Sequence, residues 1–297
     1  MSFFFEVLVG GLLSGIMYSL VALGFVLIYK ASSVFNFAQG AMVFFAVLSF
    51  VGFMELGLNF WAALPVTVAL MVAVGVLTER FVLRPLVNQS EDTLLMATIG
   101  LAFIIEGVAQ LVWGVEVRRL DLGIRDEPIG WLADKTDILV SQLDIAAGLV
   151  AGIMVAVLAL VFSKTKVGRG LRAVADDNAA ALSIGIPLKQ IWVLVWATAG
   201  VVALVAGMLW GARSGVQFAL VGVALKALPV LIIGGFTSVP GVIVAGLIVG
   251  AAEKLAEVYV GPYVGGGIEG WLPYVLAVLF LLVRPEGLFG EKIIRRV

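Results

Sequence analysis

Charged and amide side chains within apolar stretches are the residues of this chain that could do chemistry. Glu106 and Lys226 lie inside long apolar runs, and Asn36 and Gln39 open another. Ionisable groups are costly inside a membrane and amides there need partners, so such residues often bind solutes, ions or each other. The structural alternatives are a Glu106–Lys226 pair, a hydrogen bond between Glu106 and Gln110, or Lys226 reaching a membrane interface or a water-filled cavity.

Two short polar stretches could line a pathway for a solute. One contains Asn36 and Gln39, and the other, at 234–241, contains Ser238 after two glycines. Both could simply start helices, with a Ser or Asn side chain capping the first free amides. If these helix ends face a cavity, their amides could receive a carboxylate. We expect Asn36, Gln39, Glu106, Lys226 and Ser238 as candidate pathway residues.

The residue types that are missing exclude several function classes. The chain has no Cys and no His, so disulfides, thiol chemistry, the usual zinc and haem ligands and an imidazole base are excluded. We therefore expect no metal site, no catalytic residues and no enzyme activity. A net charge of -1 argues against nucleic acid as a partner. No GxxxxGK[ST] motif occurs, so ATP is not expected to bind this chain.

The composition places these residues in a lipid bilayer. The chain has 297 residues, of which 62% are hydrophobic and 13% charged, and its mean hydropathy is +1.14. Apolar runs near 20 residues without alternation favour helices, so we predict an all-α polytopic membrane protein. Eight spans are predicted at 7–29, 36–54, 61–83, 93–113, 143–162, 191–212, 239–257 and 271–283. A ninth, at 216–235, contains Lys226 and Pro229, and either crosses or forms a broken, re-entrant helix.

The spacing of small residues predicts where helices pack closely. Gly11 with Gly15, and Gly246 with Gly250, have the GxxxG spacing that lets helix backbones approach. Glu253, Lys254 and Glu257 follow near the end of the same span and are expected to be interfacial. The polar turns in the first and second parts of the chain also suggest two related halves.

Basic residues in the short connections set the expected orientation. One group of connections holds twelve of the nineteen basic residues: Lys30, Arg80, Arg84, Lys164, Lys166, Arg169, Arg172, Lys189, Arg284, Lys292, Arg295 and Arg296. The positive-inside rule places this group in the cytoplasm. With nine crossings the N-terminus is periplasmic and the C-terminus cytoplasmic. The segment 115–142 is then the main periplasmic loop.

The cytoplasmic segment 164–190 is the most informative connection. We expect Gly168 and Gly170 to break the preceding span, 171–184 to form a short helix, and Gly185 to help end it. The helix would carry a short apolar stripe of Leu171, Val174, Ala175 and Leu182. Such a helix on the membrane surface suits docking to a soluble partner, whereas a plain solvated connector is the alternative.

This segment resembles the cytoplasmic coupling loop of ABC importer permeases of the branched-chain amino acid (LivH) type. Further stretches resemble the family in the same order along the chain: LVALGFVLIYKASSVFNFAQGAM, ERFVLRPL at 79–86, TIGLAFIIEG at 98–107, IIGGFTSVPGVIVAGLIVG at 232–250 and RPEGLFG at 284–290. One departure is that the wider Glu-Ala-Ala pattern reads Asn178, Ala179, Ala180 here, so the role of that Glu does not carry over.

The resemblance implies that residues 1–297 form a single transmembrane permease domain in a bacterial inner membrane. The implied partners are a homologous second permease, two ATPase subunits that bind ATP, and a periplasmic solute-binding protein; this chain itself would bind no cofactor. The implied contacts of the 164–190 coupling loop with the ATPase are Arg169, Arg172, Ala173, Asp176, Asp177, Ala180 and Gly185.

The expected solute is a branched-chain amino acid or a related small polar solute. A permease of the same family for urea, short amides or aromatic acids is an alternative. From a different class, an ion-coupled secondary transporter would need a carboxylate relay in the membrane, for which Glu106 is the central candidate.

Overall fold

The computed structural model is mostly helical, as the sequence predicts. It describes residues 2–290 apart from 87–88, 131–134, 136–138, 177–180, 182, 184 and 186–187. Among these residues, extended pairing is limited to the isolated bridges Arg118–Val216 and Pro128–Ser141. The all-α fold is confirmed.

Among the described residues, nine apolar helices correspond to the nine predicted segments. They are α1 (Ser2–Ser32), α2 (Gln39–Glu55), α3 (Phe60–Thr78), α4 (Glu91–Trp113), α6 (Gln142–Lys164), α9 (Leu188–Ser214), α10 (Val221–Gly234), α11 (Val239–Tyr259) and α13 (Leu272–Val283). The short elements are η1 (Glu79–Leu83), η2 (Arg84–Leu86), α7 (Lys166–Asp176), η3 (Phe218–Leu220), α12 (Gly261–Val264) and η4 (Ile268–Gly270).

Helix length divides the nine into two groups. Among the described residues, six helices are long and apolar enough to cross a membrane, whereas α2, α10 and α13 are shorter. Pro229 lies inside α10 without interrupting it. With 14 residues α10 extends for about 21 Å, less than the ~30 Å hydrocarbon core. The full crossing of 216–235 therefore stays a prediction.

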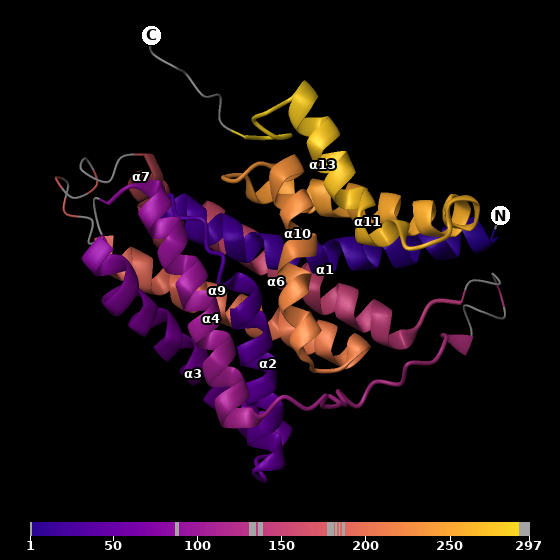
Figure 1. Ribbon diagram of the computed structural model, residues 1–297, viewed down its shortest axis with the longest axis horizontal. Helices are drawn as coiled ribbons and strands as arrows, with labels where there is room; N and C mark the ends of the chain where they lie inside the picture. Colours follow the sequence, from indigo (N-terminus) through magenta and orange to yellow (C-terminus); the bar gives the residue numbers. More distant parts are fainter. Residues whose placement is uncertain are drawn as a thin grey trace. The chain divides into compact units, whose positions relative to one another are not determined.

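The chain forms two compact units. Figure 1 labels the main helices that contribute to them. Unit 1 contains Met1–Ala22, Asp121–Val155 and Leu225–Val297, and unit 2 contains Leu23–Leu120 and Ala156–Ala224. Each unit draws on both halves of the sequence. The single domain and the two related halves stay predictions.

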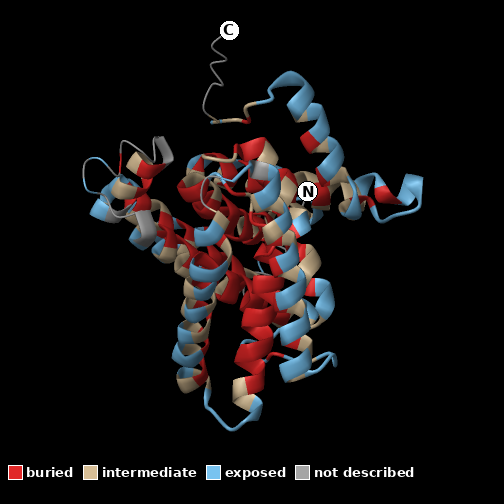
Figure 2. Cartoon of the chain, turned by 60° about the vertical axis from the view of Figure 1, so that its left-hand side comes forward, coloured by how far each residue is buried: buried red, intermediate tan, exposed pale blue. Residues whose placement is uncertain are grey.

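In unit 2, α2 forms the core. It packs against α3, α4 and α9, and every residue from Gln39 to Gly52 is buried; buried residues are red in Figure 2. Glycines bring α3 and α9 together, because a Cβ on Gly75 would lie 2.8 Å from the backbone nitrogen of Ala197. Helix α9, which begins at the end of the 164–190 segment, is thus packed closely on α3.

In unit 1, the two GxxxG motifs pack against each other. A Cβ on Gly11 would lie 2.7 Å from the carbonyl oxygen of Gly250, and a Cβ on Gly15 would clash with the backbone of Gly246. The predicted close packing is confirmed, and it joins α1 to α11. Tyr18 and Glu253 each lie three residues beyond a glycine of this contact, so they meet in the same interface.

Candidate translocation and coupling sites

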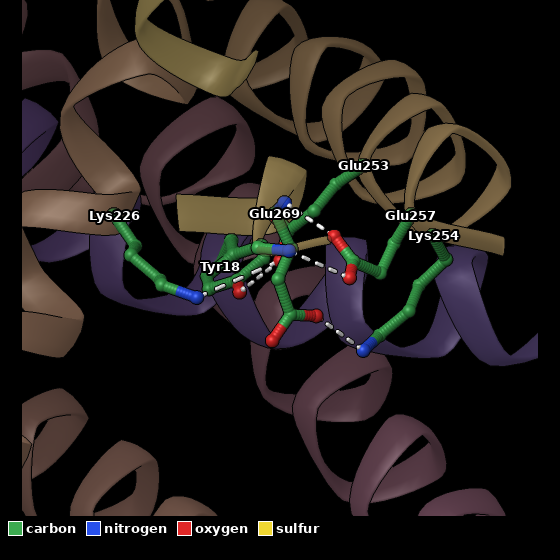
Figure 3. Close-up of polar contacts among 7 residues, drawn as sticks. Tyr18, Lys226, Glu253, Lys254, Glu257 and Glu269 are labelled. Carbon is green, nitrogen blue, oxygen red and sulfur yellow. Dashed lines mark hydrogen bonds and ion pairs between the residues drawn. The ribbon is translucent and has the colours of Figure 1, made fainter. Parts of the chain in front are cut away.

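Glu253 is a buried charged side chain that joins three helices of unit 1. Its side chain is 3% exposed, and Oε1 accepts a hydrogen bond of 3.1 Å from the Tyr18 hydroxyl on α1. The Nζ atom of Lys226 on α10 lies 3.7 Å from the same oxygen (Figure 3). No hydrogen-bond donor of the described residues reaches the other oxygen, Oε2, although it is buried. We call Tyr18, Lys226 and Glu253 the charged cluster.

The charged cluster differs from the sequence expectation in two ways. Lys226 pairs with Glu253, not with Glu106, and Glu253 is buried rather than interfacial. Glu106 is half-buried, and neither Gln110 nor any other described residue forms a hydrogen bond or ion pair with it. The signal in the sequence was the spacing of Glu253 after Gly250, which places the carboxylate on the face that packs against α1.

A second set of contacts fastens the segment after α11 to that helix. The Glu257 carboxylate accepts the backbone N–H groups of Gly267 and Glu269 at 2.9 and 3.0 Å. Lys254 donates a hydrogen bond of 2.8 Å to Glu269, and this bond holds the pKa of Glu269 below its ordinary value. Figure 3 shows these residues beside the charged cluster. We call Lys254, Glu257 and Glu269 the outer clamp.

In unit 2, Asn36 lies in the non-helical turn before α2, and Gln39 is the first residue of α2. Both are fully buried. Asn36 donates a hydrogen bond of 3.2 Å to Gln39 Oε1 and accepts the N–H of Ala38 at 3.0 Å. The Gln39 amide packs against the backbone of Gly24, because a Cβ on Gly24 would clash with that amide. The Nε2 atom of Gln39 has no partner among the described residues. Asn36 therefore holds the turn that starts α2.

Thr98 on α4 completes this site, and sequence reasoning missed it. Its hydroxyl lies 3.0 Å from the carbonyl oxygen of Phe35 and accepts the N–H of Phe37 at 3.3 Å. The only signal for Thr98 in the sequence is a polar residue inside an apolar run. We call Asn36, Gln39 and Thr98 the amide cluster.

Ser238 caps α11. Its hydroxyl accepts the N–H of Gly241 at 3.0 Å, and α10 ends at Gly234 before Gly235 adopts a φ of +98°. The structural alternative given for 234–241, a helix start capped by a Ser side chain, is therefore what Ser238 forms. Leu288, from the RPEGLFG stretch, donates its N–H to the Ile233 carbonyl at 2.7 Å, so two stretches that carry the family resemblance meet here.

The predicted coupling helix is α7, but it starts earlier than expected. Gly168 and Gly170 lie inside α7, so the prediction that they break the span is wrong: α6 ends at Lys164. Gly168 allows the tight turn between the helices, because a Cβ there would clash with the carbonyl of Phe162. Arg172 donates a hydrogen bond of 2.6 Å to that carbonyl and so caps α6.

The remaining residues of the coupling prediction are placed in part. Leu171 and Val174 are buried, and α7 packs on α9. Arg169 is exposed and Ala173 half-buried. Asp176 ends α7, and Gly185 is exposed with a left-handed φ of +84°. Asp177 and Ala180 lie outside the described residues.

The sequence of the whole chain decides the family. Residues 7–283 match the model of the branched-chain amino acid transport system permease component. The chain belongs to this permease family. The predicted family is confirmed, and with six helices of the described residues long and apolar enough to cross a membrane, the permease is a multi-pass protein of the inner membrane.

Curated relatives agree with this assignment. The permease is 26% identical to the high-affinity branched-chain amino acid transport permease BraD of Pseudomonas aeruginosa, over 99% of this chain and 98% of that one. It is 25% identical to LivH of Escherichia coli K12 over the same shares. A fructose import permease, FruF of Bifidobacterium longum, is 25% identical over 64% of this chain and 51% of its own length.

Proposed function

We propose that this permease is the membrane-spanning subunit of an ATP-driven importer of branched-chain amino acids. The observation that carries the proposal is the match over nearly the full length of both chains to permeases of such systems. The similarity to a fructose permease covers a shorter part, so it favours an amino acid over a sugar. Urea, short amides and aromatic acids are the alternative solutes that a transport assay must separate.

The proposed complex contains a second, homologous permease, two ATPase subunits and a periplasmic solute-binding protein. ATP would bind and react on the ATPase subunits. Closure of those subunits would press on the 164–190 loop, whose helix α7 packs on α9. Because α9 is packed closely on α3, such a movement would pass into unit 2.

Within the loop, the structure separates two arginines that the resemblance treats alike. Arg169 is exposed on α7 and free to meet an acidic partner, whereas Arg172 caps α6. We propose Arg169, Ala173, Asp176 and Gly185 as direct ATPase contacts, with Asp177 and Ala180 added from the resemblance. Arg172 would support the shape of the loop as well as contact the ATPase.

Co-purification with the ATPase tests this proposal. The tagged chain is co-expressed with the ATPase and permease genes that neighbour it, and the ATPase retained per permease is measured. We expect the wild type to retain it, and Arg169→Glu to lose at least 10-fold while membrane insertion is unchanged. Lys30→Glu, a charge reversal outside the loop, is the control. A wild type that never retains an ATPase, or an Arg169→Glu variant that retains it fully, would contradict the coupling assignment.

A further inference from the structure

The charged cluster is incomplete as a purely structural ion pair. Burying a carboxylate costs several kcal/mol unless each oxygen finds hydrogen-bond donors. Glu253 has one oxygen shared between Tyr18 and Lys226 and another, Oε2, that is buried with no donor among the described residues. A structural pair would be expected to satisfy both oxygens, so Oε2 points to a donor that a ligand supplies.

Lys226 is incomplete in the complementary sense. Its Nζ lies 3.7 Å from Glu253, which exceeds hydrogen-bond distance, and its side chain is 34% exposed. An ammonium group within an apolar helix cannot face lipid cheaply, so this exposed part must face water or another protein surface. Lys226 can therefore donate hydrogen bonds to an anionic group that arrives through a water-filled cavity.

A zwitterionic α-amino acid carries the two groups that the cluster lacks. Its ammonium group would donate to Glu253 Oε2, and its carboxylate would accept from Lys226. We infer that Glu253 and Lys226 form a contact site for the zwitterionic head group of the solute, with Tyr18 as the positioning residue that fixes the Glu253 carboxylate.

This inference rests on the proposed function and assigns it a substrate contact. The packing of α1 on α11 through glycines makes the site rigid, because Tyr18 and Glu253 lie three residues beyond glycines in direct contact. The pair would also disfavour solutes that carry only one charge. Such a solute would contact either Glu253 or Lys226 and leave the other side chain without a solute partner.

Solute flux per ATP is the measurement that separates solute contact from structure. The assembled complex is placed in vesicles with leucine-loaded binding protein, and leucine uptake and ATP hydrolysis are measured together. For Glu253→Gln and Lys226→Met we expect ATP hydrolysis within twofold of wild type and at least 10-fold less leucine uptake per ATP. Lys254→Met, one residue from Glu253 in the outer clamp, is the matched control and should keep the wild-type ratio.

Failure of assembly is handled by the double variant Lys226→Met/Glu253→Gln, which leaves no unpaired charge. A double variant that assembles and transports leucine normally would overturn the inference, as would single variants with a wild-type uptake per ATP. A wild type without ATP-dependent leucine uptake would instead overturn the proposed function.

A second measurement needs no variant. The wild-type complex is treated with an acetylating reagent that reacts with amines. Mass spectrometry then compares the acetylation of Lys226 with that of Lys254. Leucine should lower the Lys226 to Lys254 ratio severalfold, and an equal concentration of glycine amide, which lacks a carboxylate, should not. An unchanged ratio with leucine would contradict the assignment of Lys226.

Discussion

The amide cluster of unit 2 and the charged cluster of unit 1 are both buried polar sites, but they are built differently. Asn36 and Thr98 bond mainly to the backbone of the turn that precedes α2, so the amide cluster shapes its own segment. Tyr18, Lys226 and Glu253 come from three helices and leave one carboxylate oxygen without a donor. Each cluster leaves one buried polar atom without a partner among the described residues, Gln39 Nε2 and Glu253 Oε2. The first belongs to a neutral amide beside a turn held by backbone bonds, whereas the second belongs to a carboxylate between three helices, which suits a charged ligand.

The largest expected effect comes from separating the helices that build the charged cluster. Gly250→Val should prevent α1 and α11 from packing, because a Cβ there would lie 2.6 Å from the nitrogen of Gly15. We expect loss of monodisperse protein in fluorescence-detected size exclusion. Gly10→Val is the matched control, since nothing lies within 4 Å of a Cβ at that position. Equal behaviour of the two variants would remove the packing argument.

Removing one hydroxyl from each cluster compares them directly. Tyr18→Phe deletes a hydrogen bond to a carboxylate and should lower stability by about 1.5–3 kcal/mol. Thr98→Val deletes bonds to neutral backbone groups and should cost about 0.5–1.5 kcal/mol. Thermal unfolding of the two variants in the same detergent shows which of them loses more stability. A larger loss for Thr98→Val would contradict the stronger hydrogen bond assigned to Tyr18.

Gln39→Leu tests whether the amide cluster also serves transport. Because Gln39 Nε2 has no partner among the described residues, the substitution removes only the bond from Asn36 and should cost about 1 kcal/mol. If Gln39 lines the pathway in a state where the turn opens, leucine flux falls severalfold while assembly is unchanged. Flux at the wild-type level would assign Gln39 to the fold alone.

The outer clamp should show the smallest effect. The hydrogen bond from Lys254 lowers the pKa of Glu269, so the bond stabilises the folded protein at neutral pH. This stabilisation is lost as the pH falls through the lowered pKa. Both side chains are about one-third exposed, so Glu269→Gln should cost less than ~1 kcal/mol. Unfolding at pH 7 and at pH 3 should show a larger difference at pH 7 than at pH 3. A difference of the same size at both pH values would mean that the carboxylate charge is not its source.

Periodicity and composition predicted the fold well, because each apolar run must become a helix in lipid. The GxxxG contact and the Ser238 cap were also predictable, since both depend on local spacing. The partner of Lys226 was not, because Lys226 and Glu253 are 27 positions apart and only the packing of α10 and α11 brings them together. The role of Arg172 as a cap was hidden for a related reason, since its acceptor lies at the end of the preceding helix.

ATP-dependent uptake of labelled leucine tests the central claim most directly. Vesicles carry this permease with its neighbouring-gene partners, and uptake of leucine and of urea is measured with and without ATP inside. The account predicts leucine uptake that requires ATP and does not respond to a proton gradient. Uptake that ignores ATP and follows the proton gradient would contradict it, and would make Glu106 the residue to study next.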